Sequence, residues 1–274
     1  MAKNTARATA PSHQSFADSL LAISYRFSLH QVFDDFLTMA IAASTQNPTT
    51  KLSWYEEEYR QTIAPYKDSE LKHEFSKAFA LLILEMQERV GSEVGNDVLG
   101  DFFEVHMSKG RNGQFFTPYP ICKLLATITQ TDRTTDSERY EDIPLKVIDP
   151  TCGSGRMLLA AHSNTTTRHE YYGIDIGRMC VKMTALNLFL NGMWDSEVMC
   201  ADALRSDDFV IAYHISSFPL GIFKIEDKEQ SRLWHMHRNS FGKSEKQSIG
   251  ASIMLDKTPL SERSKDIGTQ LYLF

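Results

Sequence analysis

The chain has 274 residues, of which 42% are hydrophobic and 23% are charged, and its formal net charge is −6. These values are typical of a globular protein with one large domain or two small ones, and they exclude a long disordered or collagen-like chain. The sequence contains no apolar run long enough to span a membrane and no signal-peptide core, which predicts a cytoplasmic protein. The negative charge counts against broad non-specific binding to nucleic acid, but it leaves room for a local basic face.

The first part of the chain reads as helical. Residues 1–15 are polar and rich in alanine, and they predict a disordered tail. From Phe16 to about Met107 apolar residues recur at helical spacing, which predicts a helical region over residues 16–112. The helices expected within it lie around residues 27–41, 54–63, 71–90 and 97–105. Their apolar faces are expected to pack against one another.

After a helix expected at residues 121–129, the hydrophobic pattern changes. Short β-rich runs occur at residues 145–148, 171–174, 198–200 and 209–215, and a further strand is expected at 222–225. Helices predicted at residues 156–162 and 178–190 separate the first three runs. Alternating strands and helices predict the α/β class, with a doubly wound parallel sheet, over residues 113–238. Ligands bind such sheets beyond the carboxyl ends of the strands.

The most informative segment is a glycine turn at residues 147–157. A short apolar run ends in Asp149, turns on Gly153 and Gly155, and then opens into the apolar start of a helix. Glycines let the backbone approach a ligand closely, and an acid at a strand end can hold a polar ligand group. A glycine-rich turn alone would be a weak signal.

Four segments occur in an order that strengthens this signal: residues 113–118, 149–155, 172–176 and 200–204. The series resembles the amino-terminal motifs of S-adenosylmethionine-dependent DNA adenine-N6 methyltransferases, especially the modification subunits of type I restriction systems. The resemblance covers roughly residues 97–220. It implies a Rossmann-like methyltransferase sheet, truncated relative to the family, with S-adenosylmethionine as the cofactor. The reaction it implies is methyl transfer to N6 of adenine in DNA.

Three acids follow successive strands of the predicted sheet, and the resemblance gives each a role at the cofactor. Asp149 would face the ammonium of the methionine moiety, Asp175 would accept both ribose hydroxyls, and Asp202 would accept from the exocyclic amine. An ionised carboxylate is rarely buried without a partner, so three acids at three strand ends favour a ligand. The alternative is that each acid caps the helix or turn that follows it.

Two further groups of residues are expected at the cofactor through the same resemblance. The segment before the sheet lies over the cofactor in the family, where its threonine contacts the methionine carboxylate and its aromatic residue packs on the ligand. These contacts carry over to Gln114, Phe115, Phe116, Thr117 and Pro118. The contacts of the glycine turn carry over to Thr151, Cys152, Gly153 and Gly155. In the alternative reading, Thr117 simply caps a helix whose first residue is Pro118.

The candidate catalytic residues come from a fourth segment. In the family an Asn, Asp or Ser after the fourth strand is followed by Pro-Pro and an aromatic residue, which hold and stack a flipped adenine. Here the corresponding residues are Ser217, Phe218, Pro219 and Leu220. Phe218 replaces a proline and Leu220 replaces the stacking aromatic, a change that costs about 1–3 kcal/mol of stacking. The alternative is a core strand without catalytic content.

The carboxyl-terminal part, residues 239–274, is predicted to be a flexible tail that ends in a short apolar peptide. Gln270, Leu271, Leu273 and Phe274 resemble the peptide by which bacterial replication proteins dock on the DNA polymerase sliding clamp. The alternative is a terminal strand that packs on the sheet. Because few strands are predicted after Ser217, DNA specificity is expected to come from a specificity subunit, another DNA-recognition partner or the helical region.

Cys122, Cys152, Cys180 and Cys200 form no Cys-x-x-Cys pair and have no histidine at zinc-ligand spacing, so buried free thiols and no metal site are expected. Two functions of different classes remain open. The cofactor motifs favour a DNA adenine-N6 methyltransferase. The altered catalytic tetrad favours a weakly active or inactive relative that works as a DNA or clamp adaptor. Methylation of RNA or protein uses the same cofactor and is a third interpretation.

Overall fold

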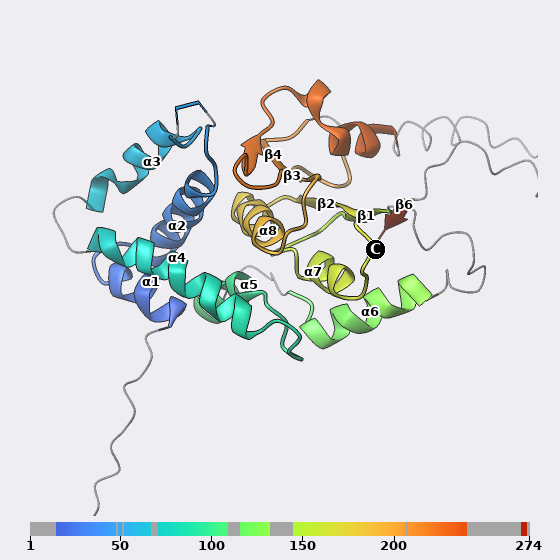
Figure 1. Ribbon diagram of the computed structural model, residues 1–274, viewed down its shortest axis with the longest axis horizontal. Helices are drawn as coiled ribbons and strands as arrows, with labels where there is room; N and C mark the ends of the chain where they lie inside the picture. Colours follow the sequence, from blue (N-terminus) through green and yellow to red (C-terminus); the bar gives the residue numbers. More distant parts are fainter. Residues whose placement is uncertain are drawn as a thin grey trace, which may run out of the picture.

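The computed structural model describes residues 15–47, 49–50, 52–66, 71–108, 116–131, 145–205, 208–239 and 270–272. A group of helices from the first part of the chain lies beside an α/β unit (Figure 1). Parts of both predicted tails lie outside the described residues, namely residues 1–14 of the first and 240–269 of the second. The same holds for Gln114, Phe115, Leu273 and Phe274.

The helical region contains the helices that the apolar spacing predicts. Its elements are α1 (Phe16–Ser24), α2 (Leu29–Ala43), α3 (Glu56–Ile63), α4 (Leu71–Glu88) and α5 (Val98–Phe103). Serine caps set two of the starts: the Ser15 hydroxyl accepts from the Asp18 N–H, and the Ser28 hydroxyl accepts from the Gln31 N–H. Within the described part of the chain, no helix is both long and apolar enough to cross a membrane.

The sheet has the order β5-β4-β3-β2-β1-β6. Its strands are β1 (Lys146–Asp149), β2 (Glu170–Asp175), β3 (Ser196–Cys200), β4 (Ile211–Ile215), β5 (Ile222–Lys224) and β6 (Gln270–Tyr272). Helices α7 (Arg156–Ser163) and α8 (Arg178–Leu190) connect β1 to β2 and β2 to β3, which run parallel. The predicted α/β class is confirmed, with helices between parallel strands. The sheet is mixed, however, because β4 runs antiparallel to β3 and β5 antiparallel to β4.

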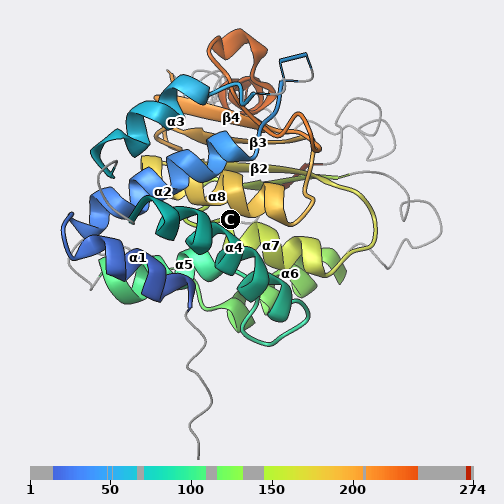
Figure 2. The ribbon, with the colours of Figure 1, turned by 60° about the vertical axis from the view of Figure 1, so that its left-hand side comes forward.

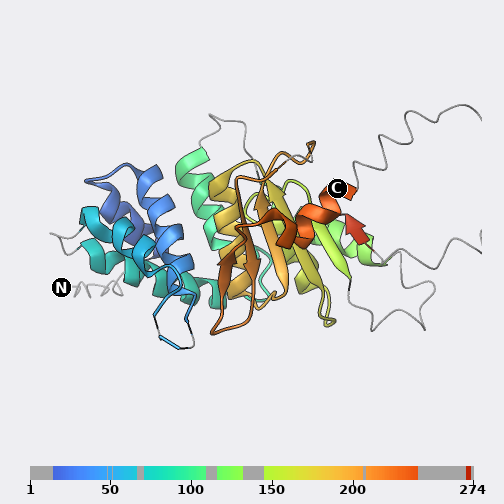
Figure 3. The same ribbon diagram turned by 90° about the horizontal axis from the view of Figure 1, so that it is seen from above.

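Alternate strand residues pack on the two faces of the sheet. Val147, Tyr171 and Val198 belong to the large core that contains the side chains of α7 and α8. Their neighbours Ile148, Tyr172 and Met199 join a smaller cluster with Leu233 and Trp234. Because successive side chains of a strand point to opposite faces, each face of the sheet packs against its own cluster of apolar side chains. In Figure 3 the segment that contains residues 225–239 lies in front of the sheet, on the face opposite to that covered by α7 and α8.

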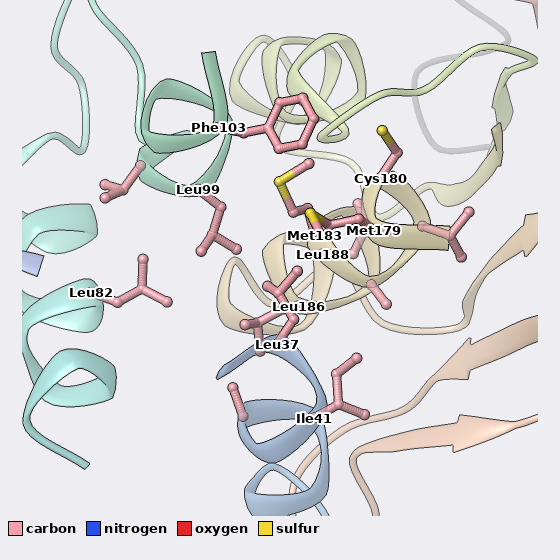
Figure 4. Close-up of a cluster of buried hydrophobic side chains, with 14 of the residues drawn as sticks. Leu37, Ile41, Leu82, Leu99, Phe103, Met179, Cys180, Met183, Leu186 and Leu188 are labelled. Atoms are coloured by element: carbon pink, nitrogen blue, oxygen red, sulfur yellow. The ribbon is translucent and has the colours of Figure 1, made fainter. Parts of the chain in front are cut away.

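The helical region and the sheet share one core. Leu37 and Ile41 of α2, Leu82 of α4 and Leu99 of α5 belong to the same buried cluster as Met183 of α8, and each of these side chains is at most 2% exposed (Figure 4). Figure 2 shows α2 beside α8. Since a fully buried side chain of this kind contributes about 1.5–3 kcal/mol, the shared core fixes the helices against the sheet. The helical region is therefore placed to support a site at the sheet.

The described residues near the end of the chain form a strand of the sheet instead of a free docking peptide. Gln270–Tyr272 forms strand β6, which pairs in parallel with β1 through Lys146↔Gln270, Val147↔Leu271 and Ile148↔Tyr272. The unpaired edge of β1 offers backbone donors and acceptors that an extended segment of the same chain can satisfy. The alternative of a terminal strand on the sheet is what the structure shows for these residues, and sliding-clamp binding is not supported.

Candidate functional site

The three predicted acids gather at one edge of the sheet. Asp149 ends β1 and Asp175 ends β2, while Asp202 lies two residues past the end of β3. Because these three strands are parallel, their carboxyl ends share that edge, with Asp149 opposite Gly173 and Asp175 opposite Cys200. This is where open α/β sheets bind ligands.

Each of these acids also caps the turn that follows it, as the alternative interpretation expected. The Asp175 carboxylate accepts from the Gly177 N–H at 2.7 Å and, across to the glycine turn, from the Gly153 N–H at 2.9 Å. Asp149 accepts from the Thr151 N–H at 3.0 Å, and Asp202 accepts from the Leu204 N–H at 2.9 Å. A carboxylate has about four lone-pair positions, so these bonds leave acceptor capacity at all three acids.

Asp149 has a pKa that departs from its usual value. Its residue is only 6% exposed, and burial together with the neighbouring charge of Asp175 raises its pKa to about 6, against the lowering effect of the Thr151 N–H. A carboxyl whose pKa is raised on folding favours the folded state when it is protonated. That contribution is present below about pH 4 and is lost as the pH rises through about 6. A cationic ligand group beside Asp149 would favour the ionised form instead.

The glycine turn takes a backbone conformation that side chains resist. Gly153 has φ +56° and Gly155 has φ +85°, both in the left-handed region. A Cβ at Gly153 would lie 2.7 Å from Cε1 of Phe116, and a Cβ at Gly155 would lie 3.0 Å from Cγ2 of Thr184. The absence of a side chain at Gly153 therefore lets the ring of Phe116 rest on the turn.

A cavity of about 230 Å³ opens between the glycine turn and the Phe116–Thr117 segment. Its lining includes predicted cofactor residues from both segments: Phe116, Thr117, Asp149, Thr151, Cys152 and Gly153. The volume is below the roughly 300–1,000 Å³ of most small-molecule sites, so it suits one half of an extended ligand. The other half would have to lie along the open surface beside Asp175 and Asp202.

A larger cavity, of about 570 Å³, lies at the same edge of the sheet but beyond β3. It is lined by residues 208–211 and 224–228, none of which is a predicted cofactor residue. We favour the smaller cavity as the cofactor site because the glycine turn, the buried acid and the aromatic segment all converge on it.

Helix α6 (Tyr119–Thr131) begins one residue later than the alternative reading of this segment required. The Pro118 carbonyl accepts from the N–H groups of Ile121 and Cys122, so Pro118 rather than Thr117 occupies the capping position. Thr117 is exposed and lines the cavity, which leaves its hydroxyl available to a ligand.

Sequence reasoning missed a buried ionic cluster behind the glycine turn. Asp97 is 1% exposed, and its carboxylate accepts from four groups: Gly100 N–H at 2.9 Å, Asn187 Nδ2 at 2.9 Å, Ser154 Oγ at 2.5 Å and Arg156 Nε at 2.8 Å. The guanidinium of Arg156 also binds Asp101 at 2.8 Å and Glu104 at 3.0 Å. Burial works to lower the pKa of Arg156, but these carboxylates together raise it. The cluster ties α5 to the start of α7.

The structure places the candidate catalytic residues Ser217, Phe218, Pro219 and Leu220 away from the candidate cofactor residues. They follow β4, which runs antiparallel to β3, so the end of β4 lies beside Ser196 at the start of β3. That edge is opposite to the one that holds Asp149, Asp175 and Asp202. The loop instead contacts the end of α2, where the Pro219 carbonyl accepts from the Gln46 N–H at 2.9 Å, and Phe218 is 71% exposed.

The four cysteines are buried free thiols, as predicted. Burial raises the pKa of Cys122 to about 11 and that of Cys152 well above its usual value, so both thiols stay protonated at neutral pH. Cys152 lines the cavity as a small apolar residue. Among the described residues, no group of His, Cys, Asp and Glu side chains is arranged to hold a metal ion.

Comparison with known proteins finds a family whose members resemble the part of the chain that holds this site. Residues 94–220 match the family of N-6 DNA methylases, and this segment contains the ionic cluster, the glycine turn and all three acids. The predicted resemblance to N6-adenine DNA methyltransferases is therefore confirmed.

Two curated relatives show how much of a methyltransferase the chain spans. It is 28% identical over 127 residues to the type I restriction enzyme MjaVII methylase subunit of Methanocaldococcus jannaschii, a match that covers 42% of this chain and 20% of that subunit. It is 28% identical over 153 residues to the type II methyltransferase M.MamI of Microbacterium ammoniaphilum, covering 48% of this chain and 42% of the relative. The chain thus spans less than half of either relative.

Solved structures overlap the chain only in part. A modification subunit of a putative type I restriction enzyme from Vibrio vulnificus has a TM-score of 0.35 and 18% identity, covering 49% of this chain and 28% of the other. A putative class I S-adenosylmethionine-dependent methyltransferase from Listeria monocytogenes has a TM-score of 0.39 and 12% identity, covering 69% and 52%.

Proposed function

We propose that the chain binds S-adenosylmethionine at the carboxyl edge of β1, β2 and β3, and that it serves methyl transfer to N6 of adenine in DNA. The observation that carries the proposal is the convergence of the glycine turn, Asp149 and the Phe116–Thr117 segment on one cavity. The match of residues 94–220 to N-6 DNA methylases supports the cofactor and the reaction class. When bound, this cofactor supplies an electrophilic methyl group.

The described residues suit the two ends of such a cofactor. At the cavity, the ionised carboxylate of Asp149 would attract an ammonium, and the exposed hydroxyl of Thr117 would donate to a carboxylate. Along the adjoining strand ends, Asp175 and Asp202 retain acceptor positions for ribose hydroxyls and an exocyclic amine. The tight turn at Gly153 would let the backbone approach the ligand closely.

Replacing Asp175 is expected to weaken cofactor binding at least tenfold. The substitution Asp175→Ala removes an acceptor for the ligand and releases the N–H of Gly153, which shapes the turn. Isothermal titration calorimetry with S-adenosylmethionine measures the change. Asp208→Ala is the matched control, because Asp208 is an exposed acid near the same edge whose described contacts are the neighbouring Phe209 N–H at 2.9 Å and Lys228 at 3.7 Å. Absence of binding by the wild type would contradict the proposal outright.

Cofactor affinity is expected to fall as the pH drops below about 6. The buried carboxyl of Asp149 has a pKa raised to about 6, and its protonation removes the charge that attracts an ammonium. Each pH unit below that value should therefore weaken binding up to about tenfold. Titrations between pH 5 and pH 8 test this expectation, with Asp149→Asn as the comparison. A variant that keeps the wild-type pH profile would show that Asp149 is not the titrating group.

A second candidate function is a catalytically weak or inactive adaptor, and one observation favours it. Ser217 lies at the opposite edge of the sheet from the cavity, whereas an acceptor for the adenine amine would have to lie near the cofactor. Methyl transfer from labelled cofactor to DNA, RNA and protein separates the candidates. The enzyme proposal expects labelled N6-methyladenine in DNA, with equal activity in Ser217→Ala. Cofactor binding without transfer to any of the three substrates would support the adaptor.

We also infer that recognition of DNA comes from a partner chain such as a specificity subunit. The net charge of −6 gives little general attraction to phosphates. This chain is similar to a protein that is named as the methylase subunit of a type I restriction enzyme. That name supports a partner of this kind.

A further inference from the structure

Glu104, at the start of the short π-helix Glu104–Ser108, connects the helical region to the segment over the cavity. One of its carboxylate oxygens accepts from the N–H of Phe116 at 3.0 Å. The other accepts from Nη1 of Arg156, also at 3.0 Å. A single side chain thus holds the backbone of the aromatic segment and the guanidinium at the start of α7.

The ring of Phe116 is held from three sides. The guanidinium carbon of Arg156 lies 5.7 Å from the centre of the ring, a distance typical of a cation–π contact. Phe103 of α5 stacks on the ring at 5.5 Å between centroids. The backbone of Gly153 lies beneath it without a side chain. The backbone and the ring of Phe116 are therefore held by Glu104, by Phe103 of α5, by Arg156 of α7 and by the glycine turn.

We propose that Glu104 and Arg156 are positioning residues, which hold the Phe116–Thr117 segment in place over the cavity before the cofactor arrives. This inference rests on the proposed function, because the segment lines the proposed cofactor site. Ordering a backbone segment costs conformational entropy, and a segment that is already ordered spares the ligand that cost. The helical region then sets cofactor affinity without touching the cofactor.

The central test compares Glu104→Ala with Glu104→Gln in the full chain. Glu104→Ala removes the acceptor for Phe116 and the pairing with Arg156, and is expected to weaken S-adenosylmethionine binding about tenfold or more. Glu104→Gln keeps an oxygen for the Phe116 N–H but loses the charge, so its affinity should fall between those of wild type and alanine variant. Glu88→Ala, at the exposed end of α4, is the matched control and should bind like the wild type.

Hydrogen exchange of the Phe116 amide provides a readout that does not need the cofactor. In Glu104→Ala this amide should exchange at least tenfold faster, because its acceptor is gone, while the strand amides of Tyr172 and Val198 stay protected. A general structural role would instead accelerate exchange at all three positions. Unchanged protection of Phe116, or wild-type affinity in Glu104→Ala, overturns the inference.

The two proposals fail in different ways. If the wild type binds no S-adenosylmethionine, the proposed function fails, while exchange at Phe116 still reports whether Glu104 orders the segment. If the wild type binds and both Glu104 variants bind equally well, only the positioning role fails. Arg156→Lys adds a further check, since lysine keeps the charge but cannot reach Asp97, Asp101 and Glu104 with one planar group. Its Phe116 exchange should fall between those of the wild type and Glu104→Ala, because Glu104 remains as the acceptor but is no longer held by the guanidinium. Wild-type exchange in this variant would count against Arg156.

Discussion

Replacing Asp97 by alanine is expected to lower the free energy of unfolding by about 3–5 kcal/mol, the usual cost of removing one partner of a buried ion pair. The Asp97 carboxylate accepts from Gly100, Ser154, Arg156 and Asn187 while only 1% exposed. Without it, a guanidinium whose side chain is 7% exposed loses its most buried counter-charge. Urea denaturation followed by circular dichroism measures the loss.

The control for this prediction is an ion pair of the same type at the surface. Arg60 and Glu56 pair at 3.0 Å on α3, with side chains that are 65% and 36% exposed. Solvent screens such a pair, so Glu56→Ala should cost less than about 1 kcal/mol. A similarly small loss in Asp97→Ala would show that the cluster adds little to stability. In that case its role would be confined to orienting Ser154 and Arg156.

The elements that local sequence dictates agree closely with the structure. Helices α7 and α8 begin at Arg156 and Arg178, where glycine turns end and apolar residues take up helical spacing. The strands that precede them end in Asp149 and Asp175. A parallel βαβ unit follows from this alternation because its crossovers obey one handedness, so the edge that holds the acids could be predicted.

The position of Ser217 could not be predicted in the same way. Its distance along the chain from Asp202 and the strand before it matched the family pattern, but a strand's direction is not written in its own residues. Just before β4 the N–H of Val210 donates to the carbonyl of Cys200 at 2.8 Å. The chain therefore reverses its direction here, and β4 runs antiparallel to β3. The end of β4 therefore falls at the far edge of the sheet.

The buried cluster was invisible in the sequence for a different reason. Asp97, Asp101 and Glu104 resemble the acids of an ordinary helix start, where a carboxylate is expected near solvent. Their common partner Arg156 is more than 50 residues away in sequence and directly follows the glycine turn. Only the packing of α5 against α7 and α8 shows that these charges meet. The position of Arg156 directly after the glycine turn is the sequence feature that could have suggested an acidic partner.

Replacing Gly153 by alanine is expected to reduce S-adenosylmethionine affinity at least about tenfold, which corresponds to a loss of roughly 1.4 kcal/mol of binding free energy. The added Cβ would lie 2.7 Å from Cε1 of Phe116, closer than two carbon atoms approach. The ring can swing away, so the fold survives, but the ring then leaves its place beside Arg156 and Phe103. Calorimetric titration measures the affinity, and thermal unfolding shows that the variant is folded.

Gly91→Ala separates steric displacement from backbone strain. Gly91 has φ +76°, also in the left-handed region, but a Cβ there would meet nothing within 4 Å. Both alanine variants carry the strain of that conformation, about 1–2 kcal/mol, so both should lose a similar amount of stability. Only Gly153→Ala should lose cofactor affinity, because only its Cβ pushes Phe116 from the turn. Equal affinities in the two variants would mean that the contact between Phe116 and the glycine turn is not part of the cofactor site.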